Sequence, residues 1–119
     1  LKATDNYVLL DLLPPLYELG RTLVLTLQNG LGNEEAVAAA LGVAGHPSPP
    51  VLGGIAFLCS NRTGPGQIHH MDHGWLRMAE WKGPATARTH QVGSLFRTSG
   101  LRCEVDDSLL FSRWGKLVW

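Results

Sequence analysis

The sequence is poor in several features that mark large classes of protein. It contains only two cysteines, Cys59 and Cys103, among 119 residues. Two are too few for a disulfide scaffold, so a reducing, cytoplasmic setting is expected. Ten Lys and Arg residues balance ten Asp and Glu residues without a run of like charge, which argues against nucleic-acid binding through a general electrostatic field. No apolar run approaches the ~20 residues of a membrane-spanning helix, so neither nucleic acid nor a membrane is an expected partner.

What the sequence does contain is enough apolar material for a core, since 45% of its residues are hydrophobic. At this length the chain makes one domain or a piece of one. It starts at Leu1-Lys2 without Met, and these first residues are typical of the end of a strand. It stops at Trp119 inside an apolar helical pattern that has no cap. We therefore expect a fragment that is truncated at both ends.

Helices and buried strands alternate along the chain. Residues 22–28 form a nearly continuous apolar run that is typical of a strand buried on both faces, and residues 51–59 form another. Between them, Asn33 is predicted to cap a helix whose first turn holds Glu34 and Glu35. This alternation indicates an α/β fold with a parallel or mixed sheet and flanking helices. The predicted elements are a helix to about Leu12, a helical turn to Leu19, a strand at 22–28, a helix at 34–41, a strand at 51–59, a hairpin of strands 67–71 and 75–80 joined at 72–74, a helix at 87–99, a strand at 101–105 and a helix from about 108.

Two of the predicted helices have a clear apolar face. In the helix at 87–99, Leu95 is expected to point inward with Val92 and Phe96. In the final helix, Lys116 lies on the side opposite an apolar stripe. A lysine at such a position is usually solvated, with its stem along the surface. The stripe consists of Leu110, Trp114, Leu117 and Val118, and the opposite side also carries Leu109 and Arg113.

Three polar features follow predicted strands, where open α/β sheets bind their ligands. Lys2 leads from a strand end into the first helix, the segment 28–32 leads into the second, and Cys59 ends the third strand. Glycines such as Gly30 let a backbone approach a ligand closely, and the helix start that follows offers free N–H groups. The amide of Asn29 can both donate and accept hydrogen bonds. A plain turn is the alternative interpretation of Asn29-Gly30.

Histidines near the predicted hairpin raise the question of a metal site. His69 and His73 have the i, i+4 spacing of a helical zinc pair, with His70 and Asp72 between them. No Glu follows His69, however, and the segment has the pattern of a hairpin, so surface histidines are expected and no metal site is predicted. A nucleophilic role for Cys59 is disfavoured too, because its apolar neighbours indicate a small buried side chain without an acid–base partner.

Five segments of the sequence together resemble the ketopantoate reductase family, the 2-dehydropantoate 2-reductases. They occur in the order and approximate spacing of that family and span essentially the whole chain, and the block at 27–32 is the most specific of them. The segments are Leu-Lys-Ala-Thr at 1–4, Leu-Gln-Asn-Gly-Leu-Gly-Asn-Glu-Glu at 27–35, Leu-Gly-Gly at 52–54, Pro-Gly-Gln-Ile-His-His at 65–70 and Trp-Gly-Lys-Leu-Val at 114–118.

The resemblance implies an oxidoreductase that binds NADPH on a Rossmann-like N-terminal domain and carries a helical C-terminal domain. Such an enzyme reduces 2-dehydropantoate to (R)-pantoate on the route to pantothenate and coenzyme A. Residues 1–119 would then be the C-terminal portion of the NADP-binding domain, ending in the first part of the helix that connects it to the missing helical domain. A small keto acid is the implied partner, with a homodimer as one candidate assembly of the full-length parent.

The resemblance also implies roles for individual residues. Asn29 matches the asparagine that touches both cofactor and substrate, and Gly30 belongs to the same cofactor-binding block. Lys2 matches the lysine near the cofactor, and Cys59 falls where a small residue contacts the cofactor through its backbone. Lys116 matches the lysine that is assigned as the proton donor and also meets the substrate.

The sequence departs from the family pattern in several respects: besides the helical domain, the basic residue expected to meet the 2′-phosphate of NADPH is missing. The Gly-x-Gly-x-x-Gly turn of dinucleotide-binding domains does not occur in it. We therefore expect the isolated chain neither to bind NADPH tightly nor to turn over. Two alternatives stay open: another two-domain Rossmann dehydrogenase of the hydroxyacid type, and a non-catalytic binding module.

Overall fold

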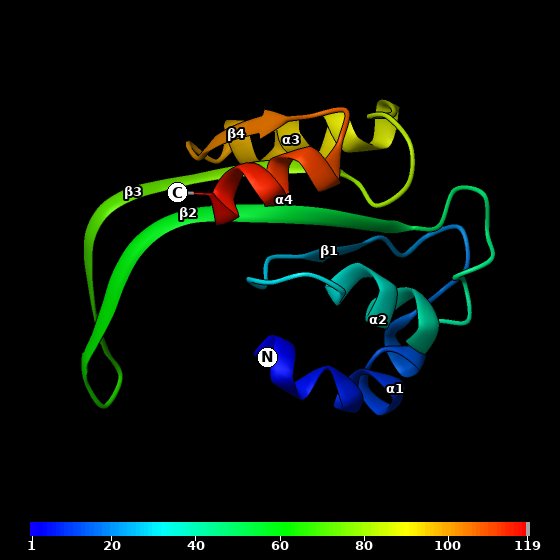
Figure 1. Ribbon diagram of the computed structural model, residues 1–119, viewed down its shortest axis with the longest axis horizontal. Helices are drawn as coiled ribbons and strands as arrows, with labels where there is room; N and C mark the ends of the chain where they lie inside the picture. Colours follow the sequence, from blue (N-terminus) through cyan, green and yellow to red (C-terminus); the bar gives the residue numbers. More distant parts are fainter. Residues whose placement is uncertain (119) are drawn as a thin grey trace.

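The computed structural model describes residues 1–118 and is built around a four-stranded mixed sheet (Figure 1). The strands lie in the order β1-β2-β3-β4. Strand β1 is parallel to β2, β2 is antiparallel to β3, and β3 is parallel to β4. Helices flank this sheet, which confirms the predicted α/β class. The strands are β1 Val24–Thr26, β2 Val51–Gly64, β3 Gln67–Glu80 and β4 Arg102–Val105.

The N-terminal segment is a helix that ends at Leu12 and a helical turn after it, as the sequence predicts, but most of the helix is 3-10 and the turn ends at Leu16 instead of Leu19. A 3-10 helix over Ala3–Val8 leads into the short α1 at Leu9–Leu12, and a second 3-10 turn follows at Pro14–Leu16. The consecutive prolines explain the break, because Pro14 has no N–H to donate. Leu9 of α1 packs into a buried cluster with residues of α2, which spans Asn33–Ala40, and of β2.

Strand β1 is shorter than the predicted strand at 22–28. Only Val24–Thr26 pair with β2, and Thr26 is the buried member of the three. A sharply turned loop follows, in which Gly30 has φ 98° and Gly32 has φ 84°. Because these positive φ angles suit glycine, the loop turns directly from the strand into α2.

The hairpin predicted at residues 72–74 is wrong. Strand β2 continues to Gly64, the chain reverses at Pro65-Gly66, and β3 runs without interruption from Gln67 to Glu80. The Asp-His-Gly segment forms a bulge in β3, where His73 has φ 65° and its N–H donates to the Asp72 carboxylate at 2.7 Å. Residues that tolerate positive φ occur in bulges as well as in turns, so the Asp-His-Gly pattern predicted a turn where the strand has a bulge. The two strands make one long bent ribbon that projects from the sheet (Figure 1).

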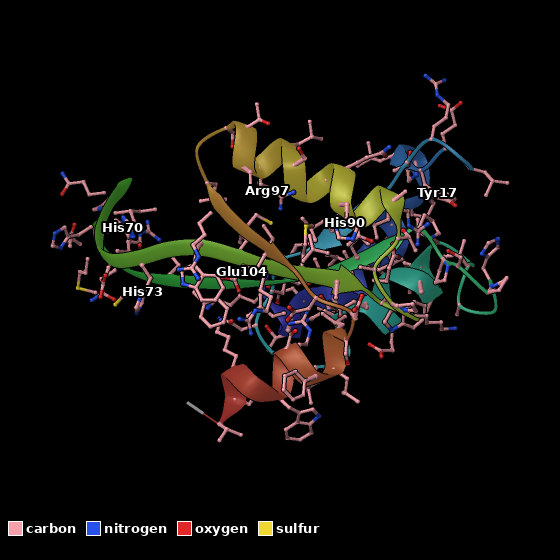
Figure 2. The ribbon with its side chains drawn as sticks, turned by 90° about the horizontal axis from the view of Figure 1, so that it is seen from above. Tyr17, His70, His73, His90, Arg97 and Glu104 are labelled. Carbon is pink, nitrogen blue, oxygen red and sulfur yellow. The ribbon has the colours of Figure 1, made fainter. Side chains whose placement is uncertain are left out.

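Helices α3 and α4 lie on opposite faces of this ribbon (Figure 2). Helix α3 spans Ala87–Thr98 and packs on the face of Leu52, with Val92 and Phe96 against that core as expected. Leu95, in contrast, is 71% exposed. The buried positions of this helix include Gly93, where an added Cβ would lie 2.8 Å from a side-chain carbon of Val105. A small residue thus brings α3 onto β4.

Helix α4 spans Leu109–Leu117 and presents its apolar stripe to solvent. The Ser108 hydroxyl accepts a hydrogen bond from Phe111 N at 3.2 Å, so the expected cap at Asp107 or Ser108 is confirmed at the serine. It is Leu109, and not the apolar stripe, that packs against Ile55 and Ala79 of the sheet. Trp119, which the sequence pattern places in the same helix, lies outside the described residues. The stripe residues Leu110, Trp114, Leu117 and Val118 are all at least half exposed.

Candidate functional site

Lys116 and Asn29, which are 87 positions apart in the chain, meet beside the sheet. The Lys116 ammonium donates to the amide oxygen of Asn29 at 2.7 Å and to the carbonyl oxygen of Ala56 at 2.8 Å. Helix α4 supplies the lysine, and the loop after β1 supplies the asparagine. Since Asn29 is exposed and its oxygen accepts from the lysine, its amide nitrogen can still donate to a ligand.

A buried asparagine shapes the loop that carries Asn29. The amide nitrogen of Asn33 donates to the carbonyl oxygens of Gln28, Asn29 and Gly30 at 3.5, 3.2 and 3.4 Å. Asn33 is 0% exposed. The prediction that it caps α2 is wrong, because Gly32 occupies the N-cap position and the Asn33 side chain turns back into the loop. Its role is to hold three consecutive loop carbonyls in place.

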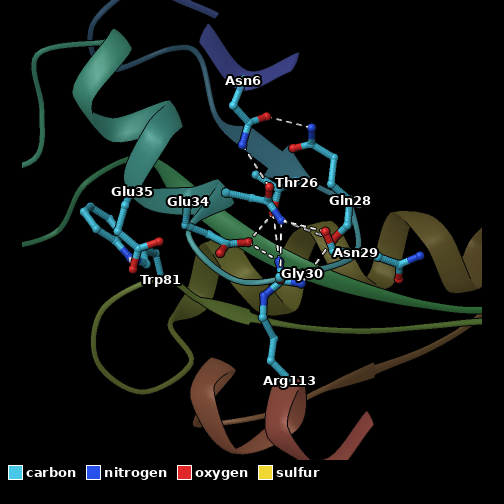
Figure 3. Close-up of polar contacts among 10 residues, drawn as sticks. Asn6, Thr26, Gln28, Asn29, Gly30, Glu34, Glu35, Trp81 and Arg113 are labelled. Carbon is cyan, nitrogen blue, oxygen red and sulfur yellow. Dashed lines mark hydrogen bonds and ion pairs between the residues drawn. The ribbon is translucent and has the colours of Figure 1, made fainter. Parts of the chain in front are cut away.

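A chain of amides ties the N-terminal segment to the same loop (Figure 3). Asn6 donates to Asn33 Oδ1 at 2.9 Å, and Gln28 donates to Asn6 Oδ1 at 2.9 Å and to Leu1 O at 3.3 Å. Lys2 is therefore held near the carboxyl end of β1. Its side chain is exposed and, within residues 1–118, makes no hydrogen bond or ion pair. The structure thus brings Lys2 to the same end of β1 as the loop that carries Asn29, but not into contact with Lys116.

Beneath Asn29 and Lys116 lies a buried charge cluster that the sequence did not reveal. The Arg113 guanidinium forms an ion pair with Glu34, and it donates to Thr26 Oγ1 at 3.3 Å and to Gln28 O at 3.2 Å (Figure 3). The Thr26 hydroxyl also donates to Glu34. Arg113 is 7% exposed and Glu34 is 2% exposed. The available signal was that Arg113 shares a helix side with Lys116, yet no local pattern connects it to Glu34.

Two adjoining cavities of about 380 Å³ each open beside Lys116. Cavities of this size suit a small organic ligand or part of a cofactor. Phe57 and Trp75 form one wall as a parallel stack with ring centroids 3.8 Å apart, and the Lys116 ammonium lies 5.6 Å from the Phe57 centroid. The first cavity is lined by Ala56, Phe57, Leu58, His73, Trp75 and Lys116, and the second by Asn29, Gly30, Leu58, Arg113, Lys116 and Leu117.

Its surroundings change the acidity of Lys116. Partial burial disfavours the charged form and lowers the pKa of the ammonium, and the positive charge of Arg113 lowers that pKa further. A lysine with a lowered pKa gives up its proton more readily than a solvated lysine does. The site therefore combines a cation, a proton source and an amide beside an apolar wall.

Cys59, like Lys2, is a predicted site residue that lines neither of these cavities. It is exposed in the middle of β2, opposite Asp72, so the expectation of a buried side chain at a strand end is wrong. Strand β2 continues beyond it, and register shifts flank it. Leu58, its neighbour, lines both cavities instead.

The histidines of the ribbon are exposed, and His70 and His73 lie on its projecting arm (Figure 2). A ring nitrogen of His70 is 3.0 Å from the carbonyl oxygen of Asp72. In the part of the chain that the structure describes, no three His, Cys, Asp or Glu side chains are grouped as metal ligands. None of the helices described there has the length and apolar character needed to cross a bilayer.

Solved structures with this fold are known. The chain matches the crystal structure of 2-dehydropantoate 2-reductase from Geobacter metallireducens GS-15 with a TM-score of 0.85 and 43% identity, over 100% of this chain and 38% of that one. The enzyme of the same name from Methylococcus capsulatus matches with a TM-score of 0.78 and 27% identity, over 100% of this chain and 36% of that one. The complex of D-mandelate dehydrogenase with NADH matches with a TM-score of 0.77 at 22% identity, over 95% of this chain and 36% of that one, and shares the fold alone.

Sequence comparison leads to the same group. The 2-dehydropantoate 2-reductase of Nostoc sp. (strain PCC 7120) is 42% identical over 124 aligned residues, which cover 100% of this chain and 37% of that enzyme. The chain thus spans little more than a third of the length of this relative. The sequence model of the family described as ketopantoate reductase PanE/ApbA matches residues 1–83. With its mixed sheet and these matches, the chain belongs to the ketopantoate reductase PanE/ApbA family.

Proposed function

We propose that this chain forms the catalytic edge of the NADP-binding domain of an NADPH-dependent 2-dehydropantoate 2-reductase. The observation that carries the proposal is the 2.7 Å contact between the Lys116 ammonium and the Asn29 amide beside a small-ligand cavity. The name of the Nostoc relative supports the choice of substrate. As in the sequence-based expectation, residues 1–119 then lead into the helix that connects to a helical substrate domain.

The residues at this edge suit the nicotinamide end of the cofactor. Phe57 and Leu58 offer an apolar wall for a planar ring, and the exposed amide of Asn29 offers a donor to a polar group. At Gly30 an added Cβ would meet no atom within 4 Å, so the backbone of the loop is open to a ligand. Lys2, at the same edge, and the backbone of Cys59 are proposed as further cofactor contacts.

NADPH supplies the hydride when it is bound. Negative charge then develops on the ketone oxygen of the keto acid, and the Lys116 ammonium stabilises that charge and delivers a proton to it. The amide oxygen of Asn29 accepts a hydrogen bond from the Lys116 ammonium and so orients it toward the substrate. The Ala56 carbonyl provides a second fixed acceptor, which leaves the remaining N–H bond of the ammonium for the substrate.

The residues that hold the adenosine phosphates are not among these 119, because the sequence has no Gly-x-Gly-x-x-Gly turn. We therefore expect the 119-residue chain by itself to bind NADPH weakly and to lack turnover. A calorimetric titration of this chain with NADPH checks the point, and tight binding would contradict it.

The proposal is tested by assaying the protein that carries this chain for NADPH oxidation. Three substrates are compared: 2-dehydropantoate, benzoylformate, which is the keto acid related to mandelate, and pyruvate. Preferential turnover of 2-dehydropantoate supports the proposal. Preference for benzoylformate would favour the second candidate, a hydroxyacid-type dehydrogenase. Two observations support this candidate: the fold shared with D-mandelate dehydrogenase and the aromatic wall of Phe57 and Trp75. Cofactor binding without turnover of any keto acid would favour a non-catalytic module.

A further inference from the structure

Arg113 is a nearly buried cation that touches three other parts of the fold. Its guanidinium pairs with Glu34 in the first turn of α2, donates to Thr26 Oγ1 in β1 and donates to Gln28 O in the loop after β1. The last of these contacts joins residues 85 positions apart. A planar guanidinium with several fixed donors suits a junction of this kind better than an ammonium does.

The contacts of Arg113 set the geometry on both sides of the Lys116–Asn29 contact. Arg113 precedes Lys116 by three positions in α4, so the two side chains leave the same side of the helix. Gln28, whose carbonyl oxygen accepts from Arg113, immediately precedes Asn29. One side chain therefore fixes the helix that carries the ammonium relative to the backbone that carries the amide.

The sheet is shaped to admit this junction. At Gly53 of β2, an added Cβ would lie 2.3 Å from a side-chain carbon of Leu109 and 2.9 Å from a carboxylate oxygen of Glu34. Only a residue without a Cβ lets α4 and Glu34 approach the strand together as they do. The close approach of α4 and α2 over Gly53 brings Arg113 within reach of its partners.

We propose that Arg113 is the positioning residue for Lys116, because it ties α4 to the end of β1 and to α2 and so holds the ammonium against Asn29. Glu34 serves this role by neutralising and orienting the guanidinium. The consequence for catalysis rests on the proposed reductase function, whereas the placement of Lys116 does not.

The charge of Arg113 adds an electrostatic consequence. It lowers the pKa of Lys116, in addition to the larger effect of burial. The other titratable or charged groups around Lys116 are His73, which reaches the same cavity from β3, and Glu34, which acts from α2 through Arg113.

The test compares Arg113→Met with Arg113→Lys in the protein that carries this chain, with Arg21→Met as the matched control at an exposed arginine far from the site. The first readout is the pKa of Lys116 from NMR of ¹³C-labelled lysine side chains, assigned by the signal lost in Lys116→Arg. We expect Arg113→Met to raise this pKa, and Arg113→Lys to keep it close to that of the unsubstituted protein. Arg21→Met should leave it unchanged.

The second readout is turnover. Misplacement of a reacting group by about 1 Å can cost on the order of 100-fold in rate. We expect a loss of roughly that size in kcat for Arg113→Met, with the KM for NADPH changed little and the basic limb of the rate profile moved to higher pH. Arg113→Lys should recover only part of the loss, because it retains the charge and can still pair with Glu34 but lacks the planar set of donors that reaches Thr26 and Gln28 at the same time.

Removing Arg113 alone leaves Glu34 buried without its partner, which can prevent folding. The double variant Glu34→Gln/Arg113→Met removes both charges, a change that buried ion pairs often tolerate. A folded Arg113→Met or double variant with an unchanged Lys116 pKa and unchanged turnover would overturn the positioning role. If the unsubstituted protein reduces no keto acid, the proposed function fails, and the NMR comparison still decides whether Arg113 sets the surroundings of the Lys116 ammonium.

Discussion

The Lys116 ammonium lies 2.7 Å from the amide oxygen of Asn29, although the two residues are 87 positions apart. The local sequence around either residue does not show that the two side chains meet. The loop after β1 provides an amide that both accepts and donates, and α4 provides a cation whose pKa is lowered by burial and by Arg113. Together they form a place where negative charge on a carbonyl oxygen can be stabilised and protonated.

Lys116→Met should lower kcat of the protein that carries this chain by about 10²–10⁴-fold, the usual worth of general-acid assistance. Lys116→Arg should recover little of the loss, because a guanidinium stays protonated at working pH and cannot deliver its proton. The dissociation constant for NADPH should change far less than kcat. Steady-state kinetics and a fluorescence titration with NADPH measure the two quantities.

The control is Lys82→Met, which removes an exposed lysine that bonds to Ala44 O on another part of the surface. It should leave both quantities unchanged. Turnover that survives Lys116→Met at the original rate would remove the lysine from the mechanism.

Asn33→Ala should destabilise the loop that carries Asn29. The substitution deprives three loop carbonyls of their shared donor and leaves the Asn6 amide without its acceptor. A cost on the order of 1–3 kcal/mol is expected for such buried polar groups, measured by urea unfolding. The matched control is Asn61→Ala at an exposed position of the ribbon. Equal stability of the two variants would show that Asn33 does not hold the loop.

Gly53→Ala should push α4 away from the sheet. The new Cβ would collide with Leu109 and approach Glu34, and overpacking of this kind typically costs about 1–3 kcal/mol. Leu109→Ala in the same chain should restore part of the loss by making room. Gly45→Ala is the control, since an added Cβ there meets nothing within 4 Å. Thermal unfolding of the four proteins compares them, and a Gly53→Ala variant as stable as the control would refute the close approach.

Glu80 makes the stability of the fold depend on pH. Burial alone would raise the pKa of this carboxyl, but hydrogen bonds from Arg88, Thr89 and Thr86 outweigh burial and hold the pKa below its ordinary value. Because the pKa is lower in the folded state than in the unfolded state, this carboxylate stabilises the fold above the unfolded-state value near 4.5. That contribution is lost as the pH falls through the lower, folded-state value.

Arg88→Met should therefore weaken the fold at neutral pH by at least about 2 kcal/mol, because it leaves the buried carboxylate without its cation. It should also raise the pKa of Glu80 toward or above the unfolded-state value, so that acidification costs the variant less stability than the unsubstituted protein and the difference between the two shrinks as Glu80 becomes protonated. Urea unfolding at a series of pH values measures both effects. Arg62→Met, at an exposed position of the ribbon, serves as the control, and identical pH profiles for the two variants would contradict the assignment.

The sequence predicted the α/β class because its apolar runs and helix signals are local. The bulge at His73 was mistaken for a turn, since both conformations use residues that tolerate positive φ. The apolar stripe around Trp114 was identified correctly as a face, but periodicity does not say whether a face is buried. The pair of Arg113 and Glu34 could not be predicted, because residues 79 positions apart meet only through the fold.

A double-mutant cycle of Asn29→Ala and Lys116→Met, measured as kcat/KM for the keto acid, tests the central claim most directly. If both side chains act on one carbonyl as a unit, the double variant should lose little more activity than Lys116→Met alone. If instead the losses of the two single variants multiply in full, the residues act independently, and the account of a shared catalytic site is wrong.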